Sequence, residues 1–227
     1  MAVAIITGAS RGLGLALATG LSGAGWRLVV DARDADALAT ATGGLDGVRT
    51  VAGDVTDPTH RAALVAAAAQ LGGPDLLVNN AGILGPSPQP RLAGYPLDVL
   101  REVFEVNVFS PLGLLQLALP ALRERAGAVV NITSDAAVEP YEGWGGYGAA
   151  KAAIEQASRI LAAEEPRVRV WWADPGDLRT RMHQEAFPGE DIGDRPSPDT
   201  VVPAFLHLVR NRPPSGRVRL AELAVTA

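Results

Sequence analysis

The sequence of 227 residues is long enough for one large α/β domain, and its 48% of hydrophobic residues is typical of a globular protein with a substantial core. A net charge of −5, with no cluster of Lys and Arg along the sequence, argues against a nucleic-acid-binding surface. The absence of cysteine excludes disulfides, thiolate catalysis and cysteine-bound metals, and it leaves the redox compartment open.

The apolar segments of the sequence do not indicate a secreted or a membrane protein. The first residues run directly into a predicted strand, without a basic region ahead of a longer apolar segment, so we expect no signal peptide. No apolar run approaches the roughly 18 to 20 residues of a membrane-spanning helix. We therefore expect a cytoplasmic protein that binds neither nucleic acid nor membrane.

Short apolar strands alternate with helical segments along the chain. Residues 3–18 (VAIITGASRGLGLALA) predict a strand, a glycine turn and a helix. Further strands are predicted at residues 27–30, 48–52, 75–78, 128–133 and 168–173, and helices at residues 36–42, 59–71, 97–125 and 147–162, with a kink or break at Pro111. The alternation predicts a single α/β domain over residues 1–227, a doubly wound (Rossmann) parallel sheet with helices on both faces.

A polar segment follows each predicted strand, and the carboxyl ends of parallel strands meet at the edge of the sheet where ligands bind. These segments are TGASRGLG, DAR, GDVTD, NNAG, TSDAA and DPGDLRT. In the first, Gly8, Gly12 and Gly14 allow positive φ angles and close backbone approach, and the start of the following helix favours an anion. We therefore expect a phosphate site there. The spacing differs from the GxGxxG fingerprint, so a purely structural turn is the alternative.

Tyr147 and Lys151 lie four residues apart on a predicted helix and therefore share one face. An ammonium beside a phenol favours the phenolate, so we expect Lys151 to lower the pKa of Tyr147 from its usual value of about 10. The phenol would then serve as a general acid or base. A solvated lysine beside a packed tyrosine is the alternative interpretation of this pair.

Five motifs occur in one order along the chain, namely TGASRGLG, NNAG, Asn107, Ser134 and YGAAK. In order and spacing they resemble the short-chain dehydrogenase/reductase family, whose motifs are TGxxxGxG, NNAG, a helical Asn, a Ser and YxxxK. The resemblance runs from Val3 to about Thr180. It implies an NAD(P)-dependent oxidoreductase that interconverts a carbonyl compound and an alcohol, and that assembles as a homodimer or homotetramer.

The resemblance also implies roles for individual residues. Ser134 corresponds to the residue that hydrogen-bonds the substrate carbonyl oxygen, and Tyr147 to the proton donor or acceptor. Lys151 corresponds to the residue that binds the nicotinamide ribose and lowers the tyrosine pKa, and Asn107 to the residue that holds a water in the proton relay. The cofactor-binding residues implied in the same way are Gly8, Ser10, Arg11, Gly12, Leu13, Gly14, Arg33, Asp54, Val55, Asn80, Ala81, Gly82, Tyr147, Lys151, Pro175, Gly176 and Thr180.

Two interpretations of the cofactor compete. An acid about twenty residues past the glycines binds the ribose 2′-hydroxyl of NAD, and Asp31 is near that position. Counted as in the family, however, the discriminating position falls on Ala32 and is followed by Arg33. A small residue followed by Arg, with Arg11 in the glycine turn, resembles the NADP pattern of the family, in which guanidinium groups bind a 2′-phosphate. We therefore favour NADP, with Asp31 as the residue that could reverse the choice.

The substrate region is less defined. Residues 181–198 are rich in Pro, Gly and acids, so we expect a variable substrate loop that acts as a mobile lid. Leu84, Met182 and Phe187 are candidates for its apolar lining, and Tyr141 and Trp144 for substrate contact. The three histidines are isolated from carboxylates at metal-ligand spacing, so no metal site is expected.

The function predicted from the resemblance is NADPH-dependent reduction of a ketone or aldehyde to an alcohol, or the reverse. The alternative is a catalytically silent protein of the same fold that senses NAD(P). The intact Asn, Ser, Tyr and Lys set argues against that alternative. Epimerase or dehydratase chemistry on a nucleotide sugar is disfavoured because such relatives usually carry a larger C-terminal substrate domain.

Overall fold

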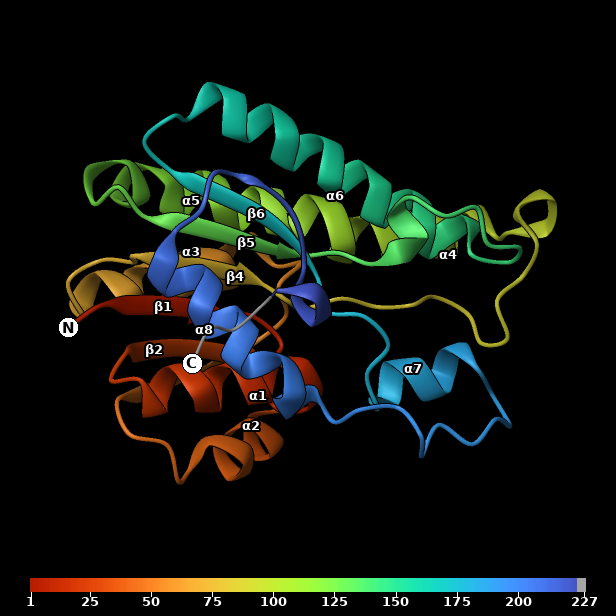
Figure 1. Ribbon diagram of the computed structural model, residues 1–227, viewed down its shortest axis with the longest axis horizontal. Helices are drawn as coiled ribbons and strands as arrows, with labels where there is room; N and C mark the ends of the chain where they lie inside the picture. Colours follow the sequence, from red (N-terminus) through yellow and green to blue (C-terminus); the bar gives the residue numbers. More distant parts are fainter. Residues whose placement is uncertain (224–227) are drawn as a thin grey trace.

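The centre of the computed structural model, which describes residues 1–223, is a seven-stranded parallel sheet (Figure 1). Its strand order is β3-β2-β1-β4-β5-β6-β7. The strands are β1 (Val3–Ile6), β2 (Arg27–Ala32), β3 (Val48–Ala52), β4 (Leu76–Asn79), β5 (Ala128–Ile132), β6 (Arg169–Asp174) and β7 (Gly216–Arg219). The doubly wound α/β fold expected from the sequence is confirmed.

Helices cover both faces of this sheet, as Figure 1 shows. The longer ones are α1 (Gly12–Gly23), α2 (Ala35–Thr42), α3 (Pro58–Gln70), α4 (Leu97–Phe104), α5 (Ser110–Glu124), α6 (Gly145–Glu164) and α8 (Val202–Asn211). Helices α1, α2 and α8 lie on one face, and α3, α5 and α6 on the other. The short helix α7 (Arg181–Ala186) lies apart from both layers, beyond the carboxyl ends of the strands.

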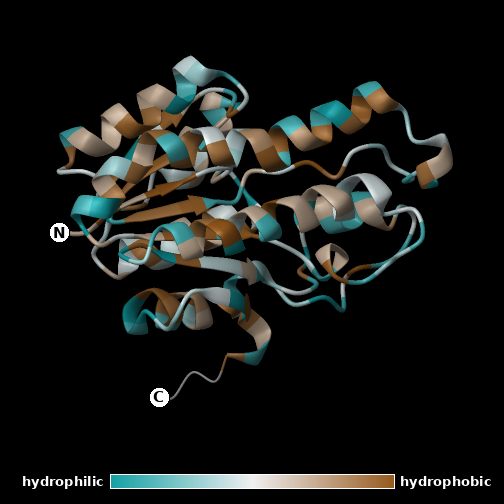
Figure 2. Cartoon of the chain, turned by 90° about the horizontal axis from the view of Figure 1, so that it is seen from above, coloured by the Kyte–Doolittle hydropathy of each residue, from teal (hydrophilic) through white to brown (hydrophobic). Residues whose placement is uncertain are grey.

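The strands form because their apolar side chains pack against the helices on both faces of the sheet. Successive residues of a strand point to opposite faces, and a strand that is buried on both sides has no polar alternation. In β1, Ala4 and Ile6 belong to the core under α1 and α8, whereas Val3 and Ile5 belong to the core under α3 and α5. All four are fully buried. Figure 2 shows the same arrangement as apolar strands between helices with polar outer positions.

The structure differs from the sequence expectation in three places. The helix expected over residues 97–125 is interrupted, but the interruption is a π-helical turn at Glu105–Phe109. The kink or break predicted at Pro111 therefore lies earlier in the chain, and Pro111 itself lies in the first turn of α5. A seventh strand, β7, was not predicted, because its GRVR sequence lacks an apolar run. The segment expected as a loop at 181–198 begins with helix α7.

One helical segment, Leu97–Glu124, is long and apolar enough to cross a membrane by length and composition. The prediction from uninterrupted apolar runs does not include this segment, because polar residues interrupt it. Its apolar side chains include Leu114, Ala118 and Leu122, which are buried in the core beneath α5. Packing against the sheet therefore accounts for the hydropathy of this segment.

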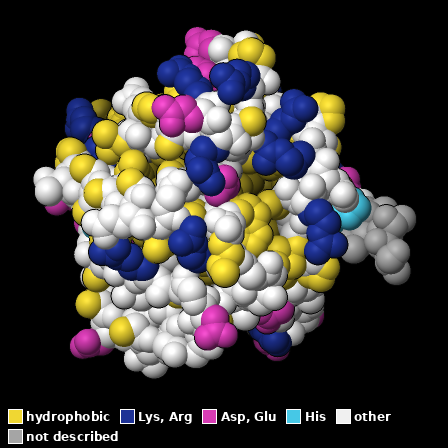
Figure 3. All heavy atoms as spheres, turned by 90° about the vertical axis from the view of Figure 1, so that its left-hand side faces the viewer, with side chains coloured by type: hydrophobic (Ala, Val, Ile, Leu, Met, Phe, Trp, Pro, Cys, Tyr) yellow, Lys and Arg dark blue, Asp and Glu magenta, His cyan; other side chains and the backbone are white. Residues whose placement is uncertain are grey.

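The edge at which the strands begin collects arginine side chains from separate segments (Figure 3). Arg27 begins β2 and Arg169 begins β6, while Arg125 stands three residues before β5. The fold thus gathers basic residues that are dispersed along the sequence. Asp75 neutralises part of this positive charge, because its Oδ1 lies 2.8 Å from Nε of Arg125. This basic edge lies opposite the carboxyl ends of the strands.

Phe205 of α8 is fully buried in the core under the sheet, whereas Leu97, the first residue of α4, is 64% exposed. Replacing Phe205 by Ala is expected to lower the free energy of unfolding by about 3–5 kcal/mol, because it leaves a cavity in a close-packed layer. Replacing Leu97 by Ala should cost less than about 1 kcal/mol, because that side chain is mostly in water. Denaturant unfolding of the two variants measures the difference, and equal losses would contradict the layer assignment.

Candidate functional site

A cavity of about 620 Å³ opens at the carboxyl ends of the strands. The loops after β1 to β6 and helix α7 line it. Every site residue expected from the sequence reaches this cavity except Asn107, which lies behind its wall. The lining members of that set are Gly8, Ser10, Arg11, Gly12, Leu13, Gly14, Arg33, Asp54, Val55, Asn80, Ala81, Gly82, Ser134, Tyr147, Lys151, Pro175, Gly176 and Thr180.

The glycine turn at the cavity floor is held by close backbone contacts. Gly8 has φ +70° and Gly12 has φ +55°, a region that favours glycine. A Cβ added to Gly14 would lie 2.3 Å from the carbonyl oxygen of Gly8, so α1 can start this close to the turn only with glycine there. The Asn80 side chain donates to the carbonyl oxygen of Thr7 at 2.8 Å and joins the turn to β4.

Helix α1 begins beneath the cavity with its first amides uncapped. Its N-cap residue, Arg11, makes no side-chain capping hydrogen bond, and no acidic residue lies in the first turn. The free N–H groups and the positive end of the helix dipole therefore face the cavity. This is the arrangement expected of a phosphate-binding turn.

The side chain of Asp31 is engaged in contacts within the protein. Its Oδ1 accepts from the backbone N–H of Gly8 at 2.7 Å, and its Oδ2 lies 3.0 Å from Nε2 of His60. The residue is fully buried. Both carboxylate oxygens are thus used within the protein, which removes the ground for treating Asp31 as a ribose ligand. The basic residues Arg11 and Arg33 are exposed at the same cavity.

Tyr147 and Lys151 both lie on α6 and are both buried, with 8% and 5% of their surface exposed. The Lys151 Nζ lies 5.4 Å from the centre of the Tyr147 ring and donates to the carbonyl oxygen of Ile132 at 2.8 Å. The expected pairing on one helix face is present in the structure. The alternative of a solvated lysine is wrong.

Burial dominates the proton affinities of this pair. Removal from water raises the pKa of Tyr147, and the carboxylates of Asp174 and Asp135 raise it further. Burial lowers the pKa of Lys151 to about 8. The tyrosine pKa is therefore raised and not lowered as the sequence predicts, because desolvation and the two carboxylates favour the protonated phenol.

Asn107 lies in the π-helical turn, next to Lys151 across Gly82. Its Nδ2 donates to the carbonyl oxygens of Ile83 at 2.8 Å and Val103 at 2.9 Å. A Cβ on Gly82 would lie 2.6 Å from the Asn107 side-chain oxygen and 3.8 Å from the Lys151 Nζ. Glycine at position 82 therefore lets the asparagine and the lysine approach the same strand end.

Ser134 follows β5 and lies on the cavity wall. Its hydroxyl donates to Oδ1 of Asp135 at 2.9 Å and accepts from the backbone N–H of Ala136 at 3.2 Å. Asp135 also accepts from the Tyr141 hydroxyl at 2.9 Å. Since Ser134 has one hydroxyl hydrogen, it can donate to another oxygen only after it turns away from Asp135.

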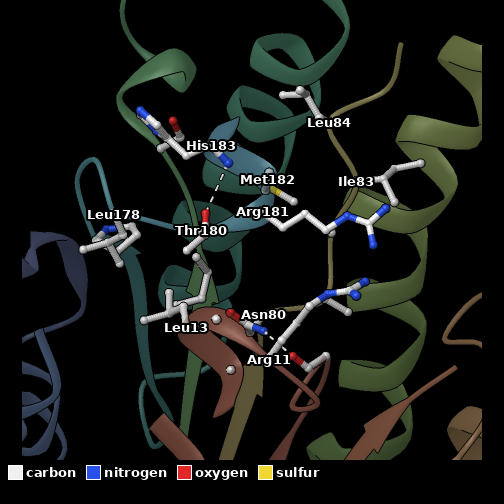
Figure 4. Close-up of a pocket in the computed structure, with 18 of the residues that line it drawn as sticks. Arg11, Leu13, Asn80, Ile83, Leu84, Leu178, Thr180, Arg181, Met182 and His183 are labelled. Carbon is white, nitrogen blue, oxygen red and sulfur yellow. Dashed lines mark hydrogen bonds between the residues drawn. The ribbon is translucent and has the colours of Figure 1, made fainter. Parts of the chain in front are cut away.

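An aromatic wall stands over Tyr147. Trp144 meets Tyr147 edge to face with ring centres 5.9 Å apart, and Phe187 lies at the same distance from Trp144. Leu84 and Met182 pack with them. Figure 4 shows Met182 and Leu84 above the glycine turn. Of the expected substrate contacts, Trp144 lines the cavity, whereas Tyr141 is half exposed and touches Asp135 instead.

A search for sequence relatives places these features in a family. The family model described as short chain dehydrogenase matches residues 2–191. The chain belongs to the short-chain dehydrogenase/reductase family. It is therefore an oxidoreductase, as the motifs of the sequence indicate.

Known members of the family resemble the chain over most of its length. It is 37% identical over 203 residues to the sepiapterin reductase of Rattus norvegicus, covering 82% of this chain and 77% of that one. It is 33% identical to the benzil reductase of Saccharomyces cerevisiae, covering 81% and 74%. Among solved structures, the alcohol dehydrogenase of Thermococcus sibiricus complexed with 5-hydroxy-NADP has a TM-score of 0.86 and 27% identity, covering 100% and 98%.

Within this family fold, the chain adds site residues that sequence reasoning missed. Asp174 lines the cavity and accepts from the backbone N–H of Gly176 at 3.0 Å and from Arg217 at 3.0 Å. Arg217 of β7 also donates to the carbonyl oxygen of Ser134 at 3.1 Å. The arginine thus joins the ends of β5 and β6. In the sequence, Asp174 directly precedes Pro175 and Gly176 of the family segment. Nothing in the sequence indicates that its partner is Arg217, 43 residues away.

Arg181 is a second missed residue. It stands at the start of α7, lines the cavity, and projects toward the same side of it as Arg11 (Figure 4). Its Nε donates to Glu185 at 2.7 Å, one turn along the helix. The two arginines bring positive charge to the glycine-turn side of the cavity.

Replacing Gly14 by Ala is expected to lower the free energy of unfolding by about 1–3 kcal/mol, because the new methyl group would overlap the Gly8 carbonyl oxygen. Gly23, at the end of the same helix, has open space around the Cβ position and serves as the matched control. Its change to Ala should alter stability by less than about 1 kcal/mol. Thermal unfolding tests both variants. Equal behaviour would contradict the close approach of α1 to the turn.

Proposed function

We propose that this oxidoreductase reduces a carbonyl group to an alcohol with NADPH, and that Tyr147 is the proton donor. The observation that carries the proposal is the buried phenol of Tyr147, beside the buried ammonium of Lys151, at the wall of a cavity whose floor is a phosphate-binding turn. The raised pKa of Tyr147 supports reduction, because it keeps the phenol protonated and ready to donate at neutral pH.

The residues present fit a dinucleotide. The uncapped start of α1 and the left-handed Gly8 and Gly12 form a cradle for the pyrophosphate, and an added side chain would disturb that cradle. Arg11 and Arg33 supply two guanidinium groups for a 2′-phosphate. The solved relative with 5-hydroxy-NADP supports the same choice, and the internal use of Asp31 removes the main argument for NAD.

The chemistry divides between cofactor and protein. A bound nicotinamide would supply hydride chemistry at the carbonyl carbon. Ser134 turns its hydroxyl from Asp135 toward the substrate oxygen and orients it, while the Tyr147 hydroxyl gives that oxygen its proton. Lys151 returns a proton to Tyr147, with Asn107 holding the relay behind Gly82. The aromatic wall of Trp144 and its neighbours excludes water from the transfer.

The substrate end of the cavity favours a carbonyl compound with an aromatic or apolar body. Trp144, Met182 and Ala186 line it, and Trp144 offers a ring edge and face for stacking. Two relatives are named as reductases of sepiapterin and of benzil, which supports reduction as the direction.

An assembly of identical chains is part of the proposal. Phe109 and Leu117 on the α5 side and Ile160 on α6 are exposed apolar side chains on the outer surface of one helical layer. A second copy packed on this layer would remove them from water. We therefore propose a homodimer or homotetramer.

Replacing Tyr147 by Phe is expected to lower kcat for carbonyl reduction by about a thousandfold, since it removes the proton donor and keeps the ring. NADPH binding, measured by fluorescence, should change little. The control is Tyr95→Phe, because Tyr95 is equally buried and its hydroxyl has no hydrogen-bond partner among the described residues. NADPH absorbance with a panel of ketones, aldehydes and diketones gives the rates.

Retained activity in the Tyr147 variant would overturn the mechanism, and NADPH binding without turnover of any carbonyl would favour the sensing alternative.

Lys151 is the only lysine in the sequence, so its titration can be followed directly by NMR after lysine-specific labelling. We expect a pKa of about 8, below the usual value, because burial disfavours the charged form. The ammonium is present below that pH and lost above it. Since Lys151 returns the proton to Tyr147, kcat/KM for reduction should be level below pH 8 and fall about tenfold per pH unit above it. A lysine that titrates near 10.4, or a rate that stays level through its titration, would contradict this role.

A further inference from the structure

His60 and Asp31 form a buried polar pair beneath the nucleotide end of the cavity. His60 lies in the first turn of α3, and Asp31 lies near the end of β2. Their side chains are 6% and 0% exposed, and Nε2 lies 3.0 Å from Oδ2. A carboxylate oxygen accepts hydrogen bonds, so the Nε2 nitrogen of His60 is the protonated one. A polar pair at this depth is costly when one partner is removed.

The carboxylate passes this contact on to the glycine turn. Its other oxygen accepts from the backbone N–H of Gly8 at 2.7 Å, and the Asp31 carbonyl oxygen accepts from the N–H of Ala9 at 2.8 Å. Asp31 therefore fixes both residues at the entry to the phosphate-binding turn. His60 in turn fixes the rotamer of Asp31, because it occupies the oxygen that points away from Gly8.

The imidazole also packs against the loop that follows β3. A Cβ added to Gly53 would lie 2.3 Å from Nδ1 of His60, so the ring is seated directly on that glycine. Asp54 and Val55, the next two residues, line the cavity. One buried ring thus contacts the supports of two separate parts of the nucleotide site.

We propose that His60 is a positioning residue for the dinucleotide. It acts through Asp31 on the Gly8 turn and sets the affinity for the phosphate-bearing half of the cofactor without taking part in the chemical step. This inference rests on the proposed nicotinamide dinucleotide, and it predicts an effect shared by NADPH and NADH, because the turn faces the pyrophosphate common to both. Arg33, by contrast, would act on the 2′-phosphate that distinguishes them.

Two isosteric substitutions separate the hydrogen bond from the bulk of the side chain. The Gln amide nitrogen can take the place of Nε2, whereas the Asn amide reaches only the place of Nδ1. His60→Gln should keep the contact and bind NADPH within about twofold of the parent protein, whereas His60→Asn should weaken both NADPH and NADH by about tenfold. At saturating cofactor, kcat of the Asn variant should stay within about twofold of the parent value, because the lost hydrogen bond affects cofactor binding and not the chemical step. Arg33→Ala should instead weaken NADPH more than NADH.

The Gly8 amide gives a readout that needs no cofactor. In protein labelled with 15N-glycine, hydrogen exchange at Gly8 should speed up in the Asn variant and stay close to the parent rate in the Gln variant, because the amide loses its fixed acceptor only in the former. Thermal unfolding confirms that each variant is folded. If the Asn variant does not fold, the Gln variant decides: its retained NADPH affinity and slow Gly8 exchange support the inference, and a tenfold loss overturns it.

The remaining outcomes are also distinct. Equal losses in the Gln and Asn variants, a loss confined to NADPH, or a fall in kcat at unchanged cofactor affinity would each overturn the positioning role of His60. A parent protein that binds neither NADPH nor NADH would overturn the proposed function instead, and the Gly8 exchange rates would still decide whether His60 acts on the turn.

Discussion

The close approach of α1 to the glycine turn is the constraint on which the site depends. With no side chain at Gly14, the helix starts against the Gly8 carbonyl, and its uncapped amides face the cavity. The same turn is tied to the next strand, since the Thr7 hydroxyl oxygen accepts from the backbone N–H groups of Asn80 and Ala81, each at 3.0 Å. The loops after β1 and β4 therefore form one unit. Strand pairing then brings the ends of β5 and β6 to the other side of the cavity.

Burial shifts the pKa values of Tyr147 and Lys151 on α6 in opposite directions, and the two shifts support each other. Exclusion of water favours the neutral form of each, so Tyr147 holds its proton more tightly and Lys151 releases its proton more readily. In the proposed mechanism the phenol gives its proton to an alkoxide, a stronger base than a phenolate. The ammonium then returns a proton to the phenolate, and its lowered pKa makes that return favourable. Attraction between the ammonium and a phenolate, acting alone, would have lowered the pKa of Tyr147.

Much of the fold and the site could be predicted from the sequence because local patterns encode them. The apolar strands, the glycine turn and the four-residue spacing of Tyr147 and Lys151 follow from periodicity and from glycine conformations. The π-helical turn that places Asn107 could not be located to the residue, since a one-residue insertion in a helix leaves its apolar pattern nearly unchanged. The direction of the Tyr147 pKa shift was also out of reach, because it depends on burial among segments that are distant in the sequence and on the carboxylates of Asp174 and Asp135.

Asp31 shows why the cofactor choice needs the tertiary structure. By spacing alone, it is an acid at the end of β2, where a ribose hydroxyl would be bound. The fold supplies two internal donors to its two oxygens, the Gly8 amide and a histidine 29 residues along the chain, and leaves none of its surface exposed. To bind a ribose, the carboxylate would have to give up one of them and leave a buried polar group unpaired. The basic residues exposed at the cavity surface on this side are Arg11 and Arg33, beside the acidic Asp34 and Asp54, and the charge of the two guanidinium groups suits a phosphate.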